Sequence, residues 1–159
     1  MDLRFLYAII LTIMPVTELR AGLPLAMAFA VDKGIPLIWM FILIVTLNIL
    51  VIFFIFYFFD VMHGRFMRFN FYRKSFEKFL IRLQKKIDKF ERRYSALGFV
   101  TLVLFVAVPL PGTGAWTGSI LSWILGLDRK KSILAISLGV VLAGILVFAG
   151  TLGIFRLLL

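Results

Sequence analysis

Glu18 and Arg20 are two ionisable residues that stand inside an otherwise apolar stretch near the start of the chain. Such a pair is costly to bury in a membrane and marks a functional site by default. Burial favours the neutral form of a carboxyl group and a nearby arginine favours the charged form, so Glu18 could load and release a proton. Arg20 offers a fork of donors that suits an anionic group such as phosphate. The structural alternative is that the two residues pair with each other or cap a helix, and so hold a turn in place.

A second candidate site, Pro109-Leu110-Pro111-Gly112-Thr113-Gly114, carries no charge. Its glycines and threonine leave backbone groups able to face a ligand. A helix that begins near Ala115 would point its N-terminal N–H groups at this stretch, which favours an anion there. The alternative is a turn that simply needs glycine.

Each candidate site separates the two members of a pair of short apolar segments. The segments cover residues 5–14, 23–31, 96–108 and 115–127. Each is too short to cross ~30 Å of hydrocarbon. Proline breaks a helix and glycine permits a tight turn, so each pair predicts a re-entrant hairpin, at about 5–31 and 96–127, whose tip is buried in protein. A single kinked spanning helix at each place is the alternative. The residues expected at the tips are Pro15, Gly22, Pro24, Pro109, Pro111, Gly112, Thr113, Gly114 and Trp116.

Two longer apolar segments, 36–59 and 132–155, can each span a bilayer as a helix. Hydrophobic residues make up 62% of the 159-residue chain, against roughly 45–50% in soluble domains, which excludes a soluble enzyme. There is no cysteine and His63 is the only histidine, so we expect no disulfide, no metal site and no cofactor.

The order of segments repeats, although the two halves share little sequence identity. We therefore predict an all-α integral membrane protein with one membrane domain over residues 1–159. The halves, 1–59 and 96–159, each contain a re-entrant hairpin and one transmembrane helix. Since each half crosses the membrane once, the second half is inverted relative to the first, as in many secondary transporters.

The linker over residues 60–95 holds eleven of the eighteen basic residues. Such a bias predicts that the linker is cytoplasmic, with both termini outside, in an inner or plasma membrane. Apolar residues recur at helical spacing along the linker, at Phe76, Leu80, Leu83, Ile87, Phe90 and Tyr94. A basic amphipathic helix of this kind can lie on anionic lipids or pair with a second copy. Base-reading motifs are missing, so we expect no nucleic-acid partner.

Several single residues carry smaller predictions. Asn48 is expected to join helices by a hydrogen bond. Ala135, Gly139 and Ala143 are spaced by four and are expected to let helices approach closely. His63 is expected at the membrane interface. Trp116 and Trp123 are interpreted as interface anchors or pocket walls.

The two candidate sites also carry a resemblance. Glu18-Leu19-Arg20-Ala21-Gly22-Leu23-Pro24 resembles the E-L-R-x-x-x-P signature of the small multi-drug export protein family, and 109–116 is similar to its P-x-P-G-T-G-A-W signature. The resemblance covers nearly the whole chain. It implies kinship with the DedA-like membrane proteins, which share paired re-entrant hairpins, and functional roles for Glu18 and Arg20. DedA-like relatives are associated with dependence on the proton-motive force and with the flipping of polyprenyl-phosphate lipids, and the resemblance implies membrane transport in this broad sense.

The sequence thus favours a proton-coupled transporter or flippase for an amphiphile, either a drug-like molecule or a lipid phosphate. An energy-independent lipid scramblase and a non-transporting membrane scaffold are the alternatives. No nucleotide-binding loop, metal site or nucleophile triad is found, so an enzyme is not expected. A homodimer would help to shield the two tips, since two spans and two hairpins make a thin bundle.

Overall fold

A computed structural model describes residues 2–71, 73–78, 81, 98–110 and 112–158. Within these residues the chain is helical and contains no strand, which confirms the all-α prediction. The helices are α1 (Leu3–Ile13), α2 (Glu18–Lys33), α3 (Leu37–Tyr57), α4 (His63–Phe66), α6 (Phe99–Ala107), α7 (Ala115–Ile124) and α8 (Arg129–Leu158). A π-helical turn, η1 (Phe58–Met62), joins α3 to α4 without a break.

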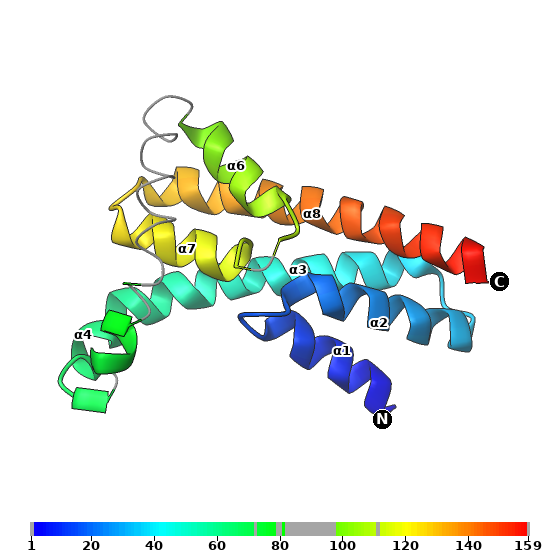
Figure 1. The fold of residues 1–159 in the computed structure, drawn as a ribbon, viewed down its shortest axis with the longest axis horizontal. Coiled ribbons are helices and arrows are strands. Elements are labelled where there is room, and N and C mark those ends of the chain that lie inside the picture. The colour runs from blue at the N-terminus through cyan, green and yellow to red at the C-terminus, as the bar shows by residue number, and fades with distance from the viewer. Residues whose placement is uncertain (1, 72, 79–80, 82–97, 111, 159) are drawn as a thin grey trace.

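Two long apolar helices form the axis of the molecule. The stretches Leu37–Phe66 and Arg129–Phe155 are long and apolar enough to cross a membrane. Only 39% and 33% of their most apolar windows are buried within the protein, so most of this apolar surface needs lipid or another apolar partner. The two predicted spans are therefore confirmed as long apolar helices. They pack side by side and run in opposite directions (Figure 1).

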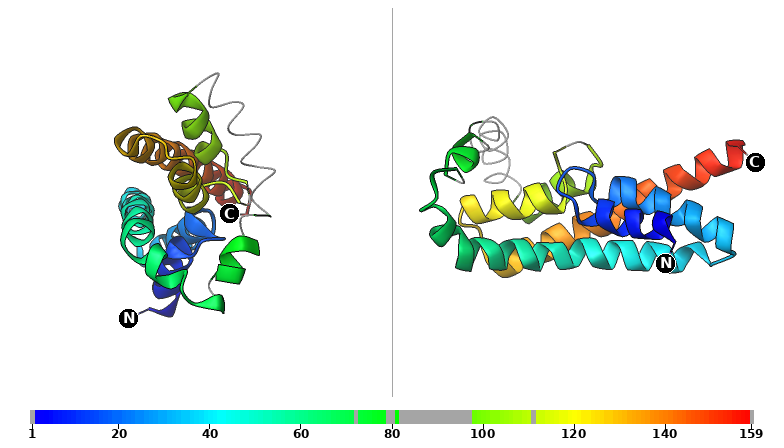
Figure 2. Two further views of the ribbon diagram at one scale, coloured as in Figure 1. Left: turned by 90° about the vertical axis from the view of Figure 1, so that its left-hand side faces the viewer. Right: turned by 90° about the horizontal axis from the view of Figure 1, so that it is seen from below.

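The four shorter helices form two pairs that approach the axis from opposite ends. The first helix pair, α1 and α2, lies along the part of α3 nearest Leu37. The second helix pair, α6 and α7, comes from the other end, and the two connections meet near the middle of the bundle (Figures 1 and 2). α1 begins and α8 ends toward the same end of the bundle (Figure 1).

The first connection is shorter than predicted. It comprises residues 14–17, because α2 already begins at Glu18, and Gly22 and Pro24 lie within α2 rather than in the turn. A Cβ on Gly22 would lie 2.0 Å from Thr12 Oγ1 and 2.9 Å from the Ala8 carbonyl oxygen, so this glycine is needed for close packing of α1 on α2. Pro24 lies inside α2, where it removes one backbone hydrogen bond and its ring crowds the preceding turn.

The second connection agrees with the prediction. Pro109, Gly112, Thr113 and Gly114 lie between α6 and α7, and Trp116 lies in the first turn of α7. Pro111 lies outside the described residues.

The packing predictions on the long helices are also confirmed. Asn48 is fully buried in α3, and its Nδ2 donates to the Thr12 carbonyl oxygen at 3.2 Å. A Cβ on Gly139 would lie 2.8 Å from the Val103 carbonyl oxygen and 2.6 Å from Val106 Cβ. Gly139 of α8 therefore lets α6 approach closely within the same chain.

An aromatic and charged cluster ties η1, α7 and α8 together at the end opposite the termini (Figure 1). Trp123 Nε1 donates to Asp60 Oδ1 at 3.2 Å, and Arg129 forms an ion pair with the same carboxylate. The His63 ring lies 4.5 Å from that of Phe76 and 5.1 Å from that of Trp123, measured between centroids. Of the linker residues at helical spacing, Phe76 alone is described, and Leu80, Leu83, Ile87, Phe90 and Tyr94 lie outside the described residues.

Candidate functional site

Glu18 is the first residue of α2, and its backbone is unusual for a glutamate. Its φ is 48°, in the left-handed region that non-glycine residues seldom adopt. Its backbone N–H donates to the Met14 carbonyl oxygen at 3.1 Å, which closes the turn. The residue is only 3% exposed. The tight turn therefore directs a buried carboxylate toward the middle of the bundle, at a cost in backbone strain typical of functional sites.

The Glu18 carboxylate caps a helix of the other half of the chain. Oε2 accepts from the Ala115 N–H at 3.1 Å, and Oε1 accepts from the Trp116 N–H at 3.1 Å. These are among the first N–H groups of α7, which have no partner inside their own helix. The N-terminal end of a helix also carries partial positive charge. The second tip, which was expected to face an anion, faces the carboxyl group of Glu18.

Gly114 makes this contact possible. Its φ is 127°, and a Cβ at this position would lie 2.0 Å from Glu18 Oε2. Any side chain here would strain the backbone and occupy the space of the carboxylate. Gly114 is therefore needed both for the turn and for the close approach of the Glu18 carboxylate.

Arg20 makes a second link between the same two tips. Its Nη2 donates to the carbonyl oxygen of Thr113 and, at 3.0 Å, to Thr113 Oγ1. The threonine hydroxyl also lies 2.7 Å from the Val108 carbonyl oxygen and 2.8 Å from that of Leu110, so it holds the second connection in shape. Among the described residues, both hydrogen bonds of the guanidinium use Nη2, which leaves Nε and Nη1 able to bind an anion.

We call the links from Glu18 to Ala115 and Trp116, and from Arg20 to Thr113, the interlock. The ion pairs within the described part of the chain do not include one between Glu18 and Arg20. Of the two structural alternatives that the sequence left open, helix capping is therefore observed and mutual pairing is not. The sequence identified the participants but gave no sign that the partner of each lies more than ninety residues away.

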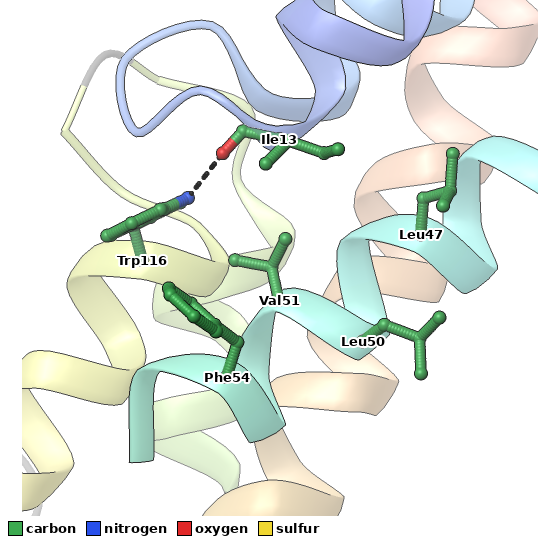
Figure 3. Close-up of a pocket in the computed structure, with 6 residues that line it drawn as sticks. All are labelled: Ile13, Leu47, Leu50, Val51, Phe54 and Trp116. Carbon is green, nitrogen blue, oxygen red and sulfur yellow. Dashed lines mark hydrogen bonds between the residues drawn. The ribbon is translucent and has the colours of Figure 1, made fainter. Parts of the chain in front are cut away.

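An apolar groove lies beside the interlock. It has a volume of about 260 Å³, and Figure 3 shows it between α7, α3 and the end of α1. Its lining residues are Ile13, Leu47, Leu50, Val51, Phe54 and Trp116. The indole Nε1 of Trp116 donates to the Ile13 carbonyl oxygen at 3.0 Å across one side of the groove (Figure 3). Trp116 is thus a pocket wall, as one of its two interpretations held, whereas no sequence signal marked the other five residues as a group.

Comparison with known proteins identifies the family. A family model described as "Putative small multi-drug export protein" matches residues 18–146. The chain belongs to this family. The match begins at Glu18 and includes every residue of the interlock, both long helices in large part, and the linker. A search of curated proteins and a search of solved structures found no match. The small multi-drug export family and the two long apolar helices together indicate a membrane protein and are consistent with a transporter.

Proposed function

We propose that this member of the family is a proton-coupled transporter or flippase for an amphiphile, with Glu18 as the proton site. One observation carries the proposal. A buried carboxylate holds two helix pairs together through hydrogen bonds of 3.1 Å to Ala115 and of 3.1 Å to Trp116. A titratable group in that position couples proton binding to the separation of the two pairs.

The coupling follows from the strength of the hydrogen bonds. A charged carboxylate accepts hydrogen bonds roughly twice as strong as those to a neutral group. Proton binding to Glu18 therefore weakens both links to α7 and removes the attraction to the helix N-terminus. By linkage, whatever favours separation of the tips also favours proton uptake. The structure described here corresponds to the charged, closed state in this proposal.

Arg20 has the complementary role of binding the anionic part of the substrate. The nitrogens Nε and Nη1 face no protein acceptor among the described residues, and the guanidinium fork suits phosphate or carboxylate. When Glu18 leaves α7, the N–H groups of Ala115 and Trp116 become additional donors. A drug-like anion or a lipid phosphate such as a polyprenyl phosphate, the class implied by kinship with DedA-like proteins, fits these donors.

The proposal includes a topology. The two helix pairs act as re-entrant hairpins of an inverted repeat, with the interlock near the midplane of an inner or plasma membrane. The basic linker lies on the cytoplasmic side against anionic lipids, and both termini lie outside. The opposed directions of α3 and α8 and the approach of the helix pairs from opposite ends support this arrangement (Figures 1 and 2). A homodimer would cover part of the exposed apolar surface.

Replacing Glu18 by glutamine tests the function. Purified protein is placed in liposomes, a pH gradient is imposed, and the movement of a fluorescent alkyl phosphate and of the anionic dye carboxyfluorescein across the bilayer is measured. Glu18→Gln is expected to abolish gradient-driven movement while the protein remains folded. Glu77→Gln is the matched control, because Glu77 is an exposed glutamate whose side chain pairs with Arg73 at 3.9 Å, and it should keep full activity.

The same assay separates the alternatives. Unchanged gradient-driven transport by Glu18→Gln would overturn the role of Glu18. Movement of phospholipids without any gradient would instead favour the scramblase. If the protein moves neither probe and neither probe raises its stability against unfolding, the result would favour the membrane scaffold.

A further inference from the structure

The apolar groove and the interlock share one residue, Trp116. Its backbone N–H donates to Glu18, its indole N–H donates to the Ile13 carbonyl oxygen, and its ring forms one wall of the groove. Figure 3 shows the ring facing Val51 and Phe54 of α3. The position of this wall therefore depends on the same contact that Glu18 makes with α7.

The groove opens on the outer surface of a long apolar helix. Leu50 is 55% exposed, Phe54 is 59% exposed and Ile13 is 44% exposed. Leu50 and Phe54 belong to the candidate span Leu37–Phe66, so in a bilayer the open side of the groove faces hydrocarbon. All six lining side chains are apolar apart from the indole N–H, which is already bonded to Ile13.

The size of the groove limits what can occupy it. Pockets for whole drug-sized ligands have volumes of roughly 300–1,000 Å³. The groove, at about 260 Å³, is below that range and is open along one side. It is suited to part of a ligand, and its apolar lining suits a hydrocarbon chain.

We propose that the groove binds the hydrocarbon chain of the transported amphiphile while Arg20 holds its anionic head. The inference rests on the proposed function and defines its substrate class: anionic amphiphiles with a long alkyl or isoprenoid chain. Because Trp116 connects the two parts, a chain in the groove and a proton on Glu18 act on the same wall. A chain in the groove contacts the indole, and release of Glu18 from the Trp116 N–H frees the same wall to move.

Photolabelling tests the site without any gradient, so its result does not depend on proton coupling. The probe is hexadecyl phosphate with a diazirine on its chain, added to the protein in lipid nanodiscs, and labelled residues are mapped by mass spectrometry. Labelling is expected to concentrate on Leu50, Phe54 and Trp116. Excess unlabelled hexadecyl phosphate should suppress it, whereas inorganic phosphate should not.

A matched pair of variants sharpens the test. Leu50→Phe fills the groove, and the exposure of Leu50 leaves room for the larger ring without overpacking the core. Labelling at Phe54 and Trp116 should then fall by about tenfold, which corresponds to the exclusion of roughly two methylene groups. Leu142→Phe, at a 43% exposed leucine of α8 outside the groove, should leave labelling unchanged.

Two results would overturn the inference. Labelling spread over all exposed apolar residues would mean that bulk lipid alone meets this surface. Cross-links between copies through the groove would mean that a second copy covers it. If labelling concentrates in the groove but no gradient-driven transport occurs, the chain site stands and the proposed function fails. If transport occurs and Leu50→Phe changes neither transport nor labelling, the function stands and the chain site fails.

Discussion

The tips of the two helix pairs differ in charge, and the difference is complementary. The first tip supplies the ionisable side chains of Glu18 and Arg20. The second supplies backbone groups, namely the N–H groups of Ala115 and Trp116 and the carbonyl oxygen of Thr113. The uncharged second tip therefore complements the first. The first tip provides ionisable side chains, and the second provides the helix end and the turn that bind them.

The two pairs also differ in how their helices pack. α1 and α2 pack directly on each other, and Gly22 allows the approach. α6 instead packs chiefly on α8, next to Gly139, and α7 packs on α3 and α8. The first pair is thus a unit held to the rest through α3, α8 and the interlock, whereas the helices of the second pair are each anchored to the long helices. In the proposed mechanism, the first pair would move as one body when the interlock opens.

The largest expected effect comes from breaking the complementarity at the second tip. Gly114→Ala places a Cβ within 2.0 Å of Glu18 Oε2 and forces alanine to a φ of 127°. We expect a loss of about 2–4 kcal/mol in the free energy of unfolding, from backbone strain and overpacking together. Chemical unfolding in detergent measures it. The control is Gly150→Ala in α8, where a Cβ would meet nothing within 4 Å, and which should not destabilise the protein.

A smaller effect is expected from loosening the first pair alone. Gly22→Ala brings a Cβ to 2.0 Å from Thr12 Oγ1, and the clash outweighs the gain in helix propensity by about 1–2 kcal/mol. Because the threonine hydroxyl is the nearest obstacle, Gly22→Ala should cost less in a Thr12→Ala background. A double-mutant cycle of unfolding free energies measures this coupling. Strictly additive effects would contradict the close packing described for α1 and α2.

The smallest effect concerns the side-chain link across the groove. Trp116→Phe keeps the ring and the backbone bond to Glu18 but removes the indole bond to the Ile13 carbonyl oxygen, at a cost of about 1 kcal/mol. Trp39→Phe, at a 60% exposed position of α3, should cost less. Hydrogen exchange should show the N–H groups of Ala115 and Trp116 still protected. Faster exchange there would mean that the indole bond, rather than the carboxylate, holds the two tips together.

The positions of the helices could be predicted because they depend on the residues within and next to each helix. Continuous apolar length marked the two long helices, and proline with glycine marked the break between α6 and α7. The first break was predicted too wide, since Gly22 and Pro24 resemble turn residues in a sequence. Gly22 serves close packing against Thr12, a requirement that only the neighbouring helix reveals. Pro24 lies inside α2 although an interior proline removes a helical hydrogen bond and crowds the preceding turn, so its place could not be predicted from local rules.

By itself, the sequence determined that the chain is all-helical, that two of its helices are long and apolar enough to span a membrane, and that Glu18 and Arg20 are exceptional. Hydropathy and charge are properties of the residues, so they can be interpreted without coordinates. The tertiary structure alone decided what those two residues contact. Glu18 could have paired with Arg20, two positions away, but it caps a helix ninety-seven residues further along the chain. The physical reason is that the first N–H groups of α7 lack partners in their own helix and converge on one point, and the fold brings the Glu18 carboxylate to that point.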